Sequence, residues 1–350
     1  MAAANIPVID ISNPSQDESQ VAKDLVEAAI EHGFIYIKNT GGDIPIDAVQ
    51  GAFDLSRELF AAPLEEKQQC KYQKNNMGWA GMQYETLDPK NQRQTLVLLT
   101  QVNRVFNFGE FIDGQPQQPI PPSISHRTSQ ISAFRDYCYN LSLKLNTLLG
   151  IGLDVNPPSF FTTSHLRSSG PSGSILRFLY YPPLPLTPTA QPGIDVRAGA
   201  HSDYGSLTML FRLPRQAGLE IQLPSGKWAP VPVSPPGTES DPAPPILVNI
   251  GDLLSYWTNG LLRSTMHRVV FSGEGNGVEG ETDTEARYSI AYFCHPVGTS
   301  SLGLVPSERV RGFKGAQVGE GERGVLTADE HLQMRYVYSV SVQEKDRCVR

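Results

Sequence analysis

Long apolar runs, clusters of basic charge and paired cysteines are all missing from this 350-residue sequence. No hydrophobic stretch approaches the roughly 20 residues that cross a bilayer. The first residues lack the charged and apolar regions of a signal peptide, so we expect a cytoplasmic protein without a membrane segment. The net charge of −7 is accompanied by no basic run, and a nucleic-acid partner is therefore not expected.

The four cysteines are too scattered to indicate a disulfide framework or a thiolate metal site. The motifs C-x-x-C, H-E-x-x-H, G-x-S-x-G and the P-loop are absent, which removes the main signals for redox dithiols, zinc proteases, serine hydrolases and nucleotide hydrolases. The 28 prolines and 31 glycines indicate many turns, as a mainly β core requires. The hydrophobic content of 39% is enough for a sizeable core.

One stretch, residues 196–211, alternates polar with small or apolar residues and predicts two strands joined by a turn at Gly205. His201 and Asp203 are two residues apart at the end of the first strand, so their side chains share a face. With His267 they form a two-histidine, one-carboxylate set, which is typical of non-haem Fe(II) oxygenases. A lone His-x-Asp more often satisfies a turn, so the interpretation depends on the residues that follow.

Arg287 and Ser289 lie on a later strand-like segment, residues 286–295, and again share one face. A guanidinium beside a hydroxyl is suited to a bidentate grip on a buried carboxylate. Taken alone, Arg287 is also compatible with a structural ion pair. The ordered series of five such residues, each on a predicted strand, favours a common site.

The order His-x-Asp, distal His and Arg-x-Ser resembles the signature of the isopenicillin-N-synthase-like family of Fe(II)/2-oxoglutarate dioxygenases. The resemblance implies a mainly β fold, a double-stranded β-helix (jelly roll) core with α-helices packed outside. It also implies one domain over 1–350, in which three segments are expected: an N-terminal family segment over 1–125, the jelly-roll core over about 174–297, and a closing segment over 298–350.

The resemblance further implies the site residues and the reaction. Fe(II) is expected on His201, Asp203 and His267. The co-substrate 2-oxoglutarate is expected on Arg287, Ser289 and Tyr181. With O2, such an enzyme hydroxylates, desaturates or otherwise oxidises a C–H bond of a small organic molecule, such as a secondary metabolite.

Six further side chains are candidate contacts with the organic substrate. Phe293 and His295 continue the face of Arg287, and Phe211 ends the strand after Asp203. In this family, the segments that contain Trp79, Tyr84 and Phe106 border the pocket. Their aromatic character indicates a ring-containing, polyketide-like, terpenoid-like or alkaloid-like substrate. A free nucleobase also fits, because fungal thymine hydroxylases belong to the same group. Ordinary aromatic packing is the competing interpretation.

Three alternatives remain open at this point: a relative that oxidises its substrate without 2-oxoglutarate, a zinc hydrolase with the same three ligands, and a jelly-roll binding protein without turnover. Two loops, 234–245 and 272–285, look long for the family and are either lids or tolerated insertions. We expect a monomer or a weak homo-oligomer.

Other polar residues are not expected to be ligands. His126 and His165 are expected at the surface or at helix ends. Asp252, which follows a glycine, is expected to serve turn chemistry.

Overall fold

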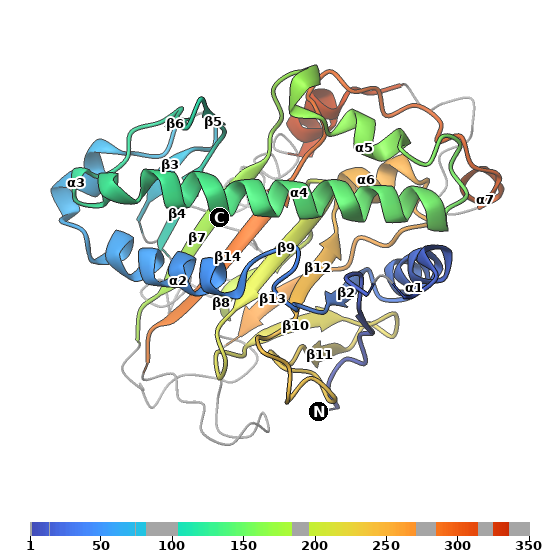
Figure 1. Ribbon diagram of the computed structural model, residues 1–350, viewed down its shortest axis with the longest axis horizontal. Coiled ribbons are helices and arrows are strands. Elements are labelled where there is room, and N and C mark those ends of the chain that lie inside the picture. The colour runs from blue at the N-terminus through green and yellow to red at the C-terminus, as the bar shows by residue number, and fades with distance from the viewer. Residues whose placement is uncertain are drawn as a thin grey trace, which may run out of the picture.

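Two facing β-sheets form the centre of the computed structural model (Figure 1), which describes residues 2–13, 15–73, 75–81, 104–183, 196–270, 285–313 and 325–335. The larger sheet has eight strands in the order β1-β2-β12-β9-β14-β7-β4-β3. These strands are β1 (Val8–Ile9), β2 (Phe34–Ile37), β12 (Ile246–Ile250), β9 (Leu207–Arg212), β14 (Arg287–Cys294), β7 (Ile175–Tyr181), β4 (Arg104–Phe108) and β3 (Gly78–Ala80).

The smaller sheet has four strands in the order β11-β10-β13-β8. They are β11 (Trp228–Pro230), β10 (Leu219–Gln222), β13 (His267–Val270) and β8 (Val196–His201). Apolar side chains of both sheets, including Phe34, Tyr36 and Leu247 from one and Ile221 and Val269 from the other, pack into one buried cluster. The sheets therefore face each other, and the predicted mainly β jelly roll is confirmed. A separate hairpin joins β5 (Phe111–Ile112) and β6 (Gln115–Pro116).

Helices cover the other face of the larger sheet. They are α1 (Glu18–Glu31), α2 (Ile46–Ala61), α3 (Leu64–Gln69), α4 (Thr128–Gly152), α5 (Phe160–Ser164), α6 (Asp252–Trp257), α7 (Glu308–Gly312) and the 3-10 turns η2 (Pro122–Arg127) and η3 (Arg167–Ser169). The long α4 runs across this face, with α2 beside it (Figure 1). Its stripe of Ile131, Phe134, Cys138, Leu141 and Leu145 is buried, as expected for a helix packed outside the sheet. No helix among the described ranges is long and apolar enough to cross a membrane.

The two faces of the larger sheet differ in chemistry because side chains alternate along each strand. On the helix-covered face, Ile290 of β14 lies opposite Phe211 of β9 and Phe178 of β7, and Phe178 in turn lies opposite Phe106 of β4. These side chains belong to the apolar core under the helices. The opposite, inner face carries Arg287 and Ser289 from β14.

This alternation corrects three expectations about the substrate pocket. Phe211 packs against Phe134 of α4, with ring centroids 5.2 Å apart, and Phe106 stacks on Phe108 at 4.6 Å. Trp79 lies opposite Phe106 in the pairing of β3 with β4, so it shares that face and packs against the same core. All three side chains therefore stabilise the contact between sheet and helices, and none lies on the inner face.

His165 lies at the end of α5, one of its two expected positions, but its side chain is buried. It is 3% exposed, its Nδ1 lies 2.7 Å from the carbonyl oxygen of Phe161, and its Nε2 lies 2.9 Å from Ser206 Oγ. Burial lowers the pKa of His165 to about 4. His126, in contrast, is exposed as predicted.

The position of Phe211 predicts a stability effect. Replacing Phe211 with Ala removes a buried ring between the sheet and α4, and such truncations cost about 3–5 kcal/mol. We expect the free energy of unfolding in urea to fall by about this amount. Ile112→Ala, at a side chain that is 57% exposed, is the matched control and should leave stability unchanged. A loss below about 1 kcal/mol for Phe211→Ala would contradict this placement.

The burial of His165 predicts a pH effect. Its pKa is near 6.5 when unfolded and about 4 when folded, so between these values the unfolded chain binds more protons. The free energy of unfolding should therefore rise with pH through this window and fall as pH drops from 6.5 to 4. His165→Gln removes up to one proton from the difference between the unfolded and folded states. The slope of the free energy of unfolding against pH should therefore fall by up to about 1.4 kcal/mol per pH unit. Urea unfolding of the wild type and of His165→Gln at pH 5 and 7 measures this difference. An equal change of stability with pH in the two proteins would refute the prediction.

Candidate metal centre

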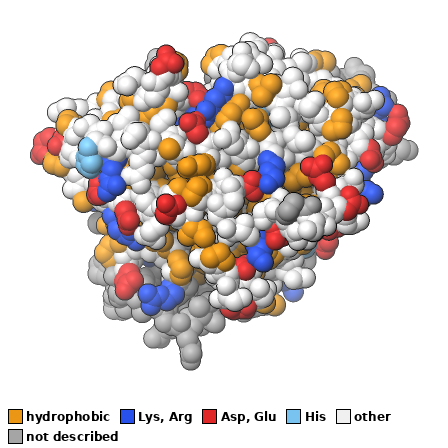
Figure 2. Space-filling model, in the orientation of Figure 1, with side chains coloured by type: hydrophobic (Ala, Val, Ile, Leu, Met, Phe, Trp, Pro, Cys, Tyr) orange, Lys and Arg blue, Asp and Glu red, His pale blue; other side chains and the backbone are white. Residues whose placement is uncertain are grey.

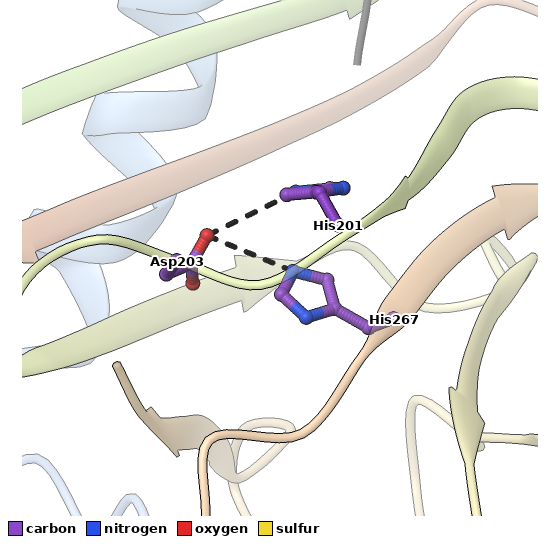
Figure 3. Close-up of side chains that lie close together, drawn as sticks. All are labelled: His201, Asp203 and His267. Carbon is purple, nitrogen blue, oxygen red and sulfur yellow. Dashed lines mark ion pairs between the residues drawn. The ribbon is translucent and has the colours of Figure 1, made fainter. Parts of the chain in front are cut away.

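Two histidines and one carboxylate converge at one end of the smaller sheet (Figure 3). His201 ends β8 and lies directly opposite His267, which begins β13. Asp203 follows β8 by two residues. Its Oδ1 lies 3.8 Å from Nε2 of His201 and 3.7 Å from Nε2 of His267. One ligand atom from each residue lies within 4.8 Å of the others. Among the described residues, this is the one group of three metal-ligating side chains so close together.

Backbone carbonyls fix the orientation of both imidazoles. Nδ1 of His201 lies 2.8 Å from the carbonyl oxygen of Gly199, and Nδ1 of His267 lies 3.1 Å from that of Thr265. With Nδ1–H as the donor, Nε2 of each ring is the nitrogen left to bind a metal, and it lies within 4 Å of Asp203 Oδ1. This is the outer-shell arrangement that metal-binding histidines use.

Electrostatics favour the protonation states that a metal requires. Burial, reinforced by neighbouring His267, lowers the pKa of His201 to about 4, so its ring is neutral at physiological pH. Burial opposes ionisation of Asp203, but the two histidines and a hydrogen bond from Asn249 outweigh it and lower its pKa. The Asn249 bond to Asp203 Oδ2 measures 2.8 Å. Two imidazoles and a carboxylate fit Fe(II) and leave positions for other ligands.

A buried cationic pocket lies on the inner face of β14. Arg287 is 6% exposed, and its Nε donates to the carbonyl oxygen of Ala217 at 3.0 Å. Its Nη1 is buried and has no hydrogen-bond partner within the described ranges. Tyr181 of β7 lies directly opposite Arg287, with the guanidinium 5.0 Å from its ring centroid, and Ser289 is buried on the same face.

The charge of this pocket suits an anion. Burial lowers the pKa of Arg287 to about 10, and the neighbouring Tyr181 acts in the opposite direction. Arg287 is therefore still cationic at neutral pH. A buried guanidinium nitrogen without a protein acceptor is costly unless a ligand supplies one. The carboxylate of a bound acid would satisfy this nitrogen and the Ser289 hydroxyl together.

An aromatic and a cationic side chain lie close together on the inner face of the larger sheet. Phe293 of β14 shares the face of Arg287, as predicted from period two. The guanidinium of Arg177, on β7, lies 5.2 Å from the Phe293 ring centroid, and its Nε donates to Asn107 Oδ1 at 2.8 Å. Arg177 is also near enough to His201 to contribute to its lowered pKa.

Arg177 was not among the predicted site residues, although a signal for it exists. It lies four residues before Tyr181 on the same strand, so period two places both side chains on one face.

Of the remaining candidates, His295 is buried and Tyr84 lies outside the described residues. The ring of His295 fills the space between Gly173 and Gly205, where an added Cβ at Gly205 would lie 2.9 Å from its Nε2. Burial lowers the pKa of His295 to about 4, and the nearby His165 acts in the same direction. The structure thus shows a packed, neutral imidazole next to the segment that carries Asp203.

Comparisons with known proteins identify two family matches. Residues 6–122 match the N-terminal family described as "non-haem dioxygenase in morphine synthesis N-terminal", and residues 172–296 match the 2OG-Fe(II) oxygenase superfamily. The second match contains both histidines, the carboxylate and the Arg-x-Ser pair described above.

Similar proteins extend over most of the chain. The UPF0676 protein C1494.01 of Schizosaccharomyces pombe is 33% identical over 307 residues, covering 85% of this chain and 83% of its own. The 2-oxoglutarate-dependent dioxygenase htyE of Aspergillus rugulosus is 28% identical, covering 85% and 88%. The crystal structure of a full-length Neurospora crassa protein in complex with alpha-KG matches with a TM-score of 0.72 and 27% identity, covering 94% and 95%.

The fold, the metal-ligating set and these matches agree with the expectation from the sequence. The predicted family and the predicted cofactors Fe(II), 2-oxoglutarate and O2 are confirmed at the level of the family. The chain therefore belongs to the Fe(II)/2-oxoglutarate-dependent dioxygenases, a family of oxidoreductases.

Proposed function

We propose that this dioxygenase oxidises a C–H bond of a small organic metabolite at an Fe(II) ion held by His201, Asp203 and His267. The observation that carries the proposal is the convergence of these three side chains, with both Nε2 atoms less than 4 Å from one carboxylate oxygen. When bound, Fe(II) and 2-oxoglutarate supply oxidative decarboxylation of the co-substrate by O2, which gives succinate, CO2 and the oxidant for the C–H bond. Hydroxylation is the default outcome, and substrate position decides whether desaturation or further oxidation follows.

The protein contributes binding, orientation and exclusion of water. Arg287 and Ser289 would hold the far carboxylate of 2-oxoglutarate, and Tyr181 would pack beside it. The buried, unsatisfied Nη1 of Arg287 supports this role, since the carboxylate supplies the missing acceptor. A zinc hydrolase would leave Arg287 without a function.

The substrate class that the inner face supports is a small, planar, ring-containing molecule with oxygen acceptors. Phe293 places an aromatic ring on this face, and the Arg177 guanidinium, 5.2 Å from the ring centroid, gives the same region a positive charge. The Neurospora crassa protein has also been crystallised in complex with alpha-KG and thymine, and that chain is 26% identical to this one. Thymine is a small planar ring with oxygen acceptors. The fungal relatives htyE, gloF and traH are named 2-oxoglutarate-dependent dioxygenases, and a Glycine max relative is named a homoarginine-6-hydroxylase, so relatives differ in substrate.

We further infer a single-domain cytosolic protein that is a monomer or weak homo-oligomer and does not bind nucleic acid. The larger of the two apolar clusters in the described ranges extends from Ile9 to Ala328, which supports a single domain. Cys70, Cys138 and Cys294 are buried, free thiols, which suits a reducing compartment. Acidic and basic side chains are interspersed on the face in Figure 2, and the net charge is negative. The structure describes the loop over 234–245, whereas all but the last residue of the loop over 272–285 lies outside the described ranges. A role as a lid stays a prediction for both loops.

An anaerobic titration tests the metal and the co-substrate together. Fe(II) and then 2-oxoglutarate, added to apo-protein without O2, should produce the weak visible charge-transfer band of the chelate. His267→Ala should abolish the band by removing an iron ligand. His126→Ala, at an exposed histidine, is the control and should retain it. Iron binding without a band would indicate a relative that does not use 2-oxoglutarate, and absence of iron binding would refute the oxygenase proposal.

The same titration tests Arg287. Arg287→Ala removes a charge-assisted contact worth about 1.5–3 kcal/mol, so the 2-oxoglutarate concentration at half-maximal band intensity should rise roughly 10- to 100-fold. Iron binding measured before 2-oxoglutarate is added should be unchanged. Arg309→Ala, which removes a surface guanidinium paired with Glu27, is the matched control. An unchanged half-saturation point for Arg287→Ala would place the co-substrate elsewhere.

A further inference from the structure

Asp252 lies where three separate segments of the chain meet beside the metal centre. Its Oδ1 accepts a hydrogen bond from Ser264 Oγ at 2.6 Å, and its Oδ2 accepts one from Ser202 Oγ at 3.0 Å. The same Oδ2 pairs with Nη2 of Arg335 at 2.5 Å. Both carboxylate oxygens are thus hydrogen-bonded or ion-paired. A residue that serves only its own turn, as expected from the Gly-Asp pair, would not make these contacts with three other segments.

The two serines belong to the segments that deliver the metal ligands. Ser202 lies between His201 and Asp203, and Ser264 precedes His267 by three residues. One carboxylate therefore holds the end of β8 and the approach to β13 at a fixed distance from each other. Ligand spacing at a metal depends on such contacts behind the ligands.

Backbone contacts join the same two regions. The N–H of Asp252 donates to the carbonyl oxygen of Asp203 at 2.7 Å, and that of Gly251 donates to Ser206 at 2.9 Å. A Cβ at Gly251 would lie 2.2 Å from the carbonyl oxygen of Gly205, so the turn before α6 sits directly against the ligand segment. The Asp252 carboxylate is consequently held at a fixed place relative to Asp203.

The third segment comes from the C-terminal part of the chain. Arg335 lies at the end of the described range 325–335, and its guanidinium is 5.4 Å from the ring centroid of Tyr204, the residue after Asp203. Upstream, this range is bonded to the chain that follows β14, through Ala328 N–H to Ser300 at 2.9 Å and Leu302 N–H to Leu326 at 2.8 Å. Arg335 therefore connects the C-terminal segment to the loop that carries the metal ligands.

We propose that Asp252 is a positioning residue for the metal centre. Through Ser202 and Ser264 it sets the spacing of the ligands on β8 and β13, and Arg335 holds its carboxylate in place. The spacing of the metal ligands therefore depends on the packing of the C-terminal segment against Asp252. This inference rests on the proposed iron site.

Metal affinity separates this role from a purely structural one. Asp252 is also the first residue of α6, so its loss could lower stability without affecting the site. Co(II), added to apo-protein and followed by its visible ligand-field absorption, reports the ligands directly and needs no turnover. Asp252→Asn should weaken Co(II) binding about 10- to 100-fold, the range typical of outer-shell changes at metal sites. Ser202→Ala combined with Ser264→Ala should reproduce most of this loss.

The matched control is Asp54→Asn, which removes an exposed aspartate paired with Arg57 on α2 and should leave Co(II) affinity unchanged. Circular dichroism at the titration temperature shows that each variant is folded. Folded Asp252→Asn protein that binds Co(II) within twofold of wild type would overturn the positioning role alone. Wild-type protein that binds no Co(II) would overturn the proposed iron site and this inference together.

A double-substitution cycle tests the link to the C-terminal segment. Arg335→Gln should weaken Co(II) binding several-fold in otherwise wild-type protein and add nothing once Asp252→Asn is present, because both changes act through one carboxylate. Equal effects of Arg335→Gln in the two backgrounds, or no effect in either, would show that the C-terminal segment is not coupled to the ligands through Asp252.

Discussion

The pairing of β8 with β13 is the constraint on which the active site depends. The antiparallel register places His201 directly opposite His267, and Asp203 follows in the turn that leaves β8. A shift of this register by one residue would turn one histidine to the other face of the sheet, and the three metal-ligating side chains would no longer converge. Within each strand, the carbonyls of Gly199 and Thr265 then fix the orientation of the two imidazoles.

The larger sheet separates packing from chemistry by its two faces. Its helix-covered face is apolar and supplies most of the core, including Phe211 and Ile290. Its inner face carries Arg287, Ser289 and Asn249, buried polar groups that are costly in a core unless they are partnered. Asn249 is partnered by Asp203, whereas Nη1 of Arg287 lacks a partner in the described chain and is available to an anionic co-substrate.

The sequence was informative wherever a function depends on local spacing. Period two alone placed His201 with Asp203 and Arg287 with Ser289, and the family signature linked the two pairs. Period two does not say which face the helices cover, so Phe211, Phe106 and Trp79 were assigned to the pocket although they pack in the core. The burial of His165 and the side-chain contacts of Asp252 could not be predicted for another reason: their partners Ser206, Ser202 and Arg335 are distant in sequence and are brought close only by the fold.

A crystal grown without O2 in the presence of Fe(II) and 2-oxoglutarate would test the central claim most directly. The account predicts an anomalous peak for iron bounded by Nε2 of His201, Nε2 of His267 and the carboxylate of Asp203. It also predicts that the far carboxylate of 2-oxoglutarate contacts Arg287 and Ser289. Iron bound to other residues, or a co-substrate carboxylate away from Arg287, would contradict the account.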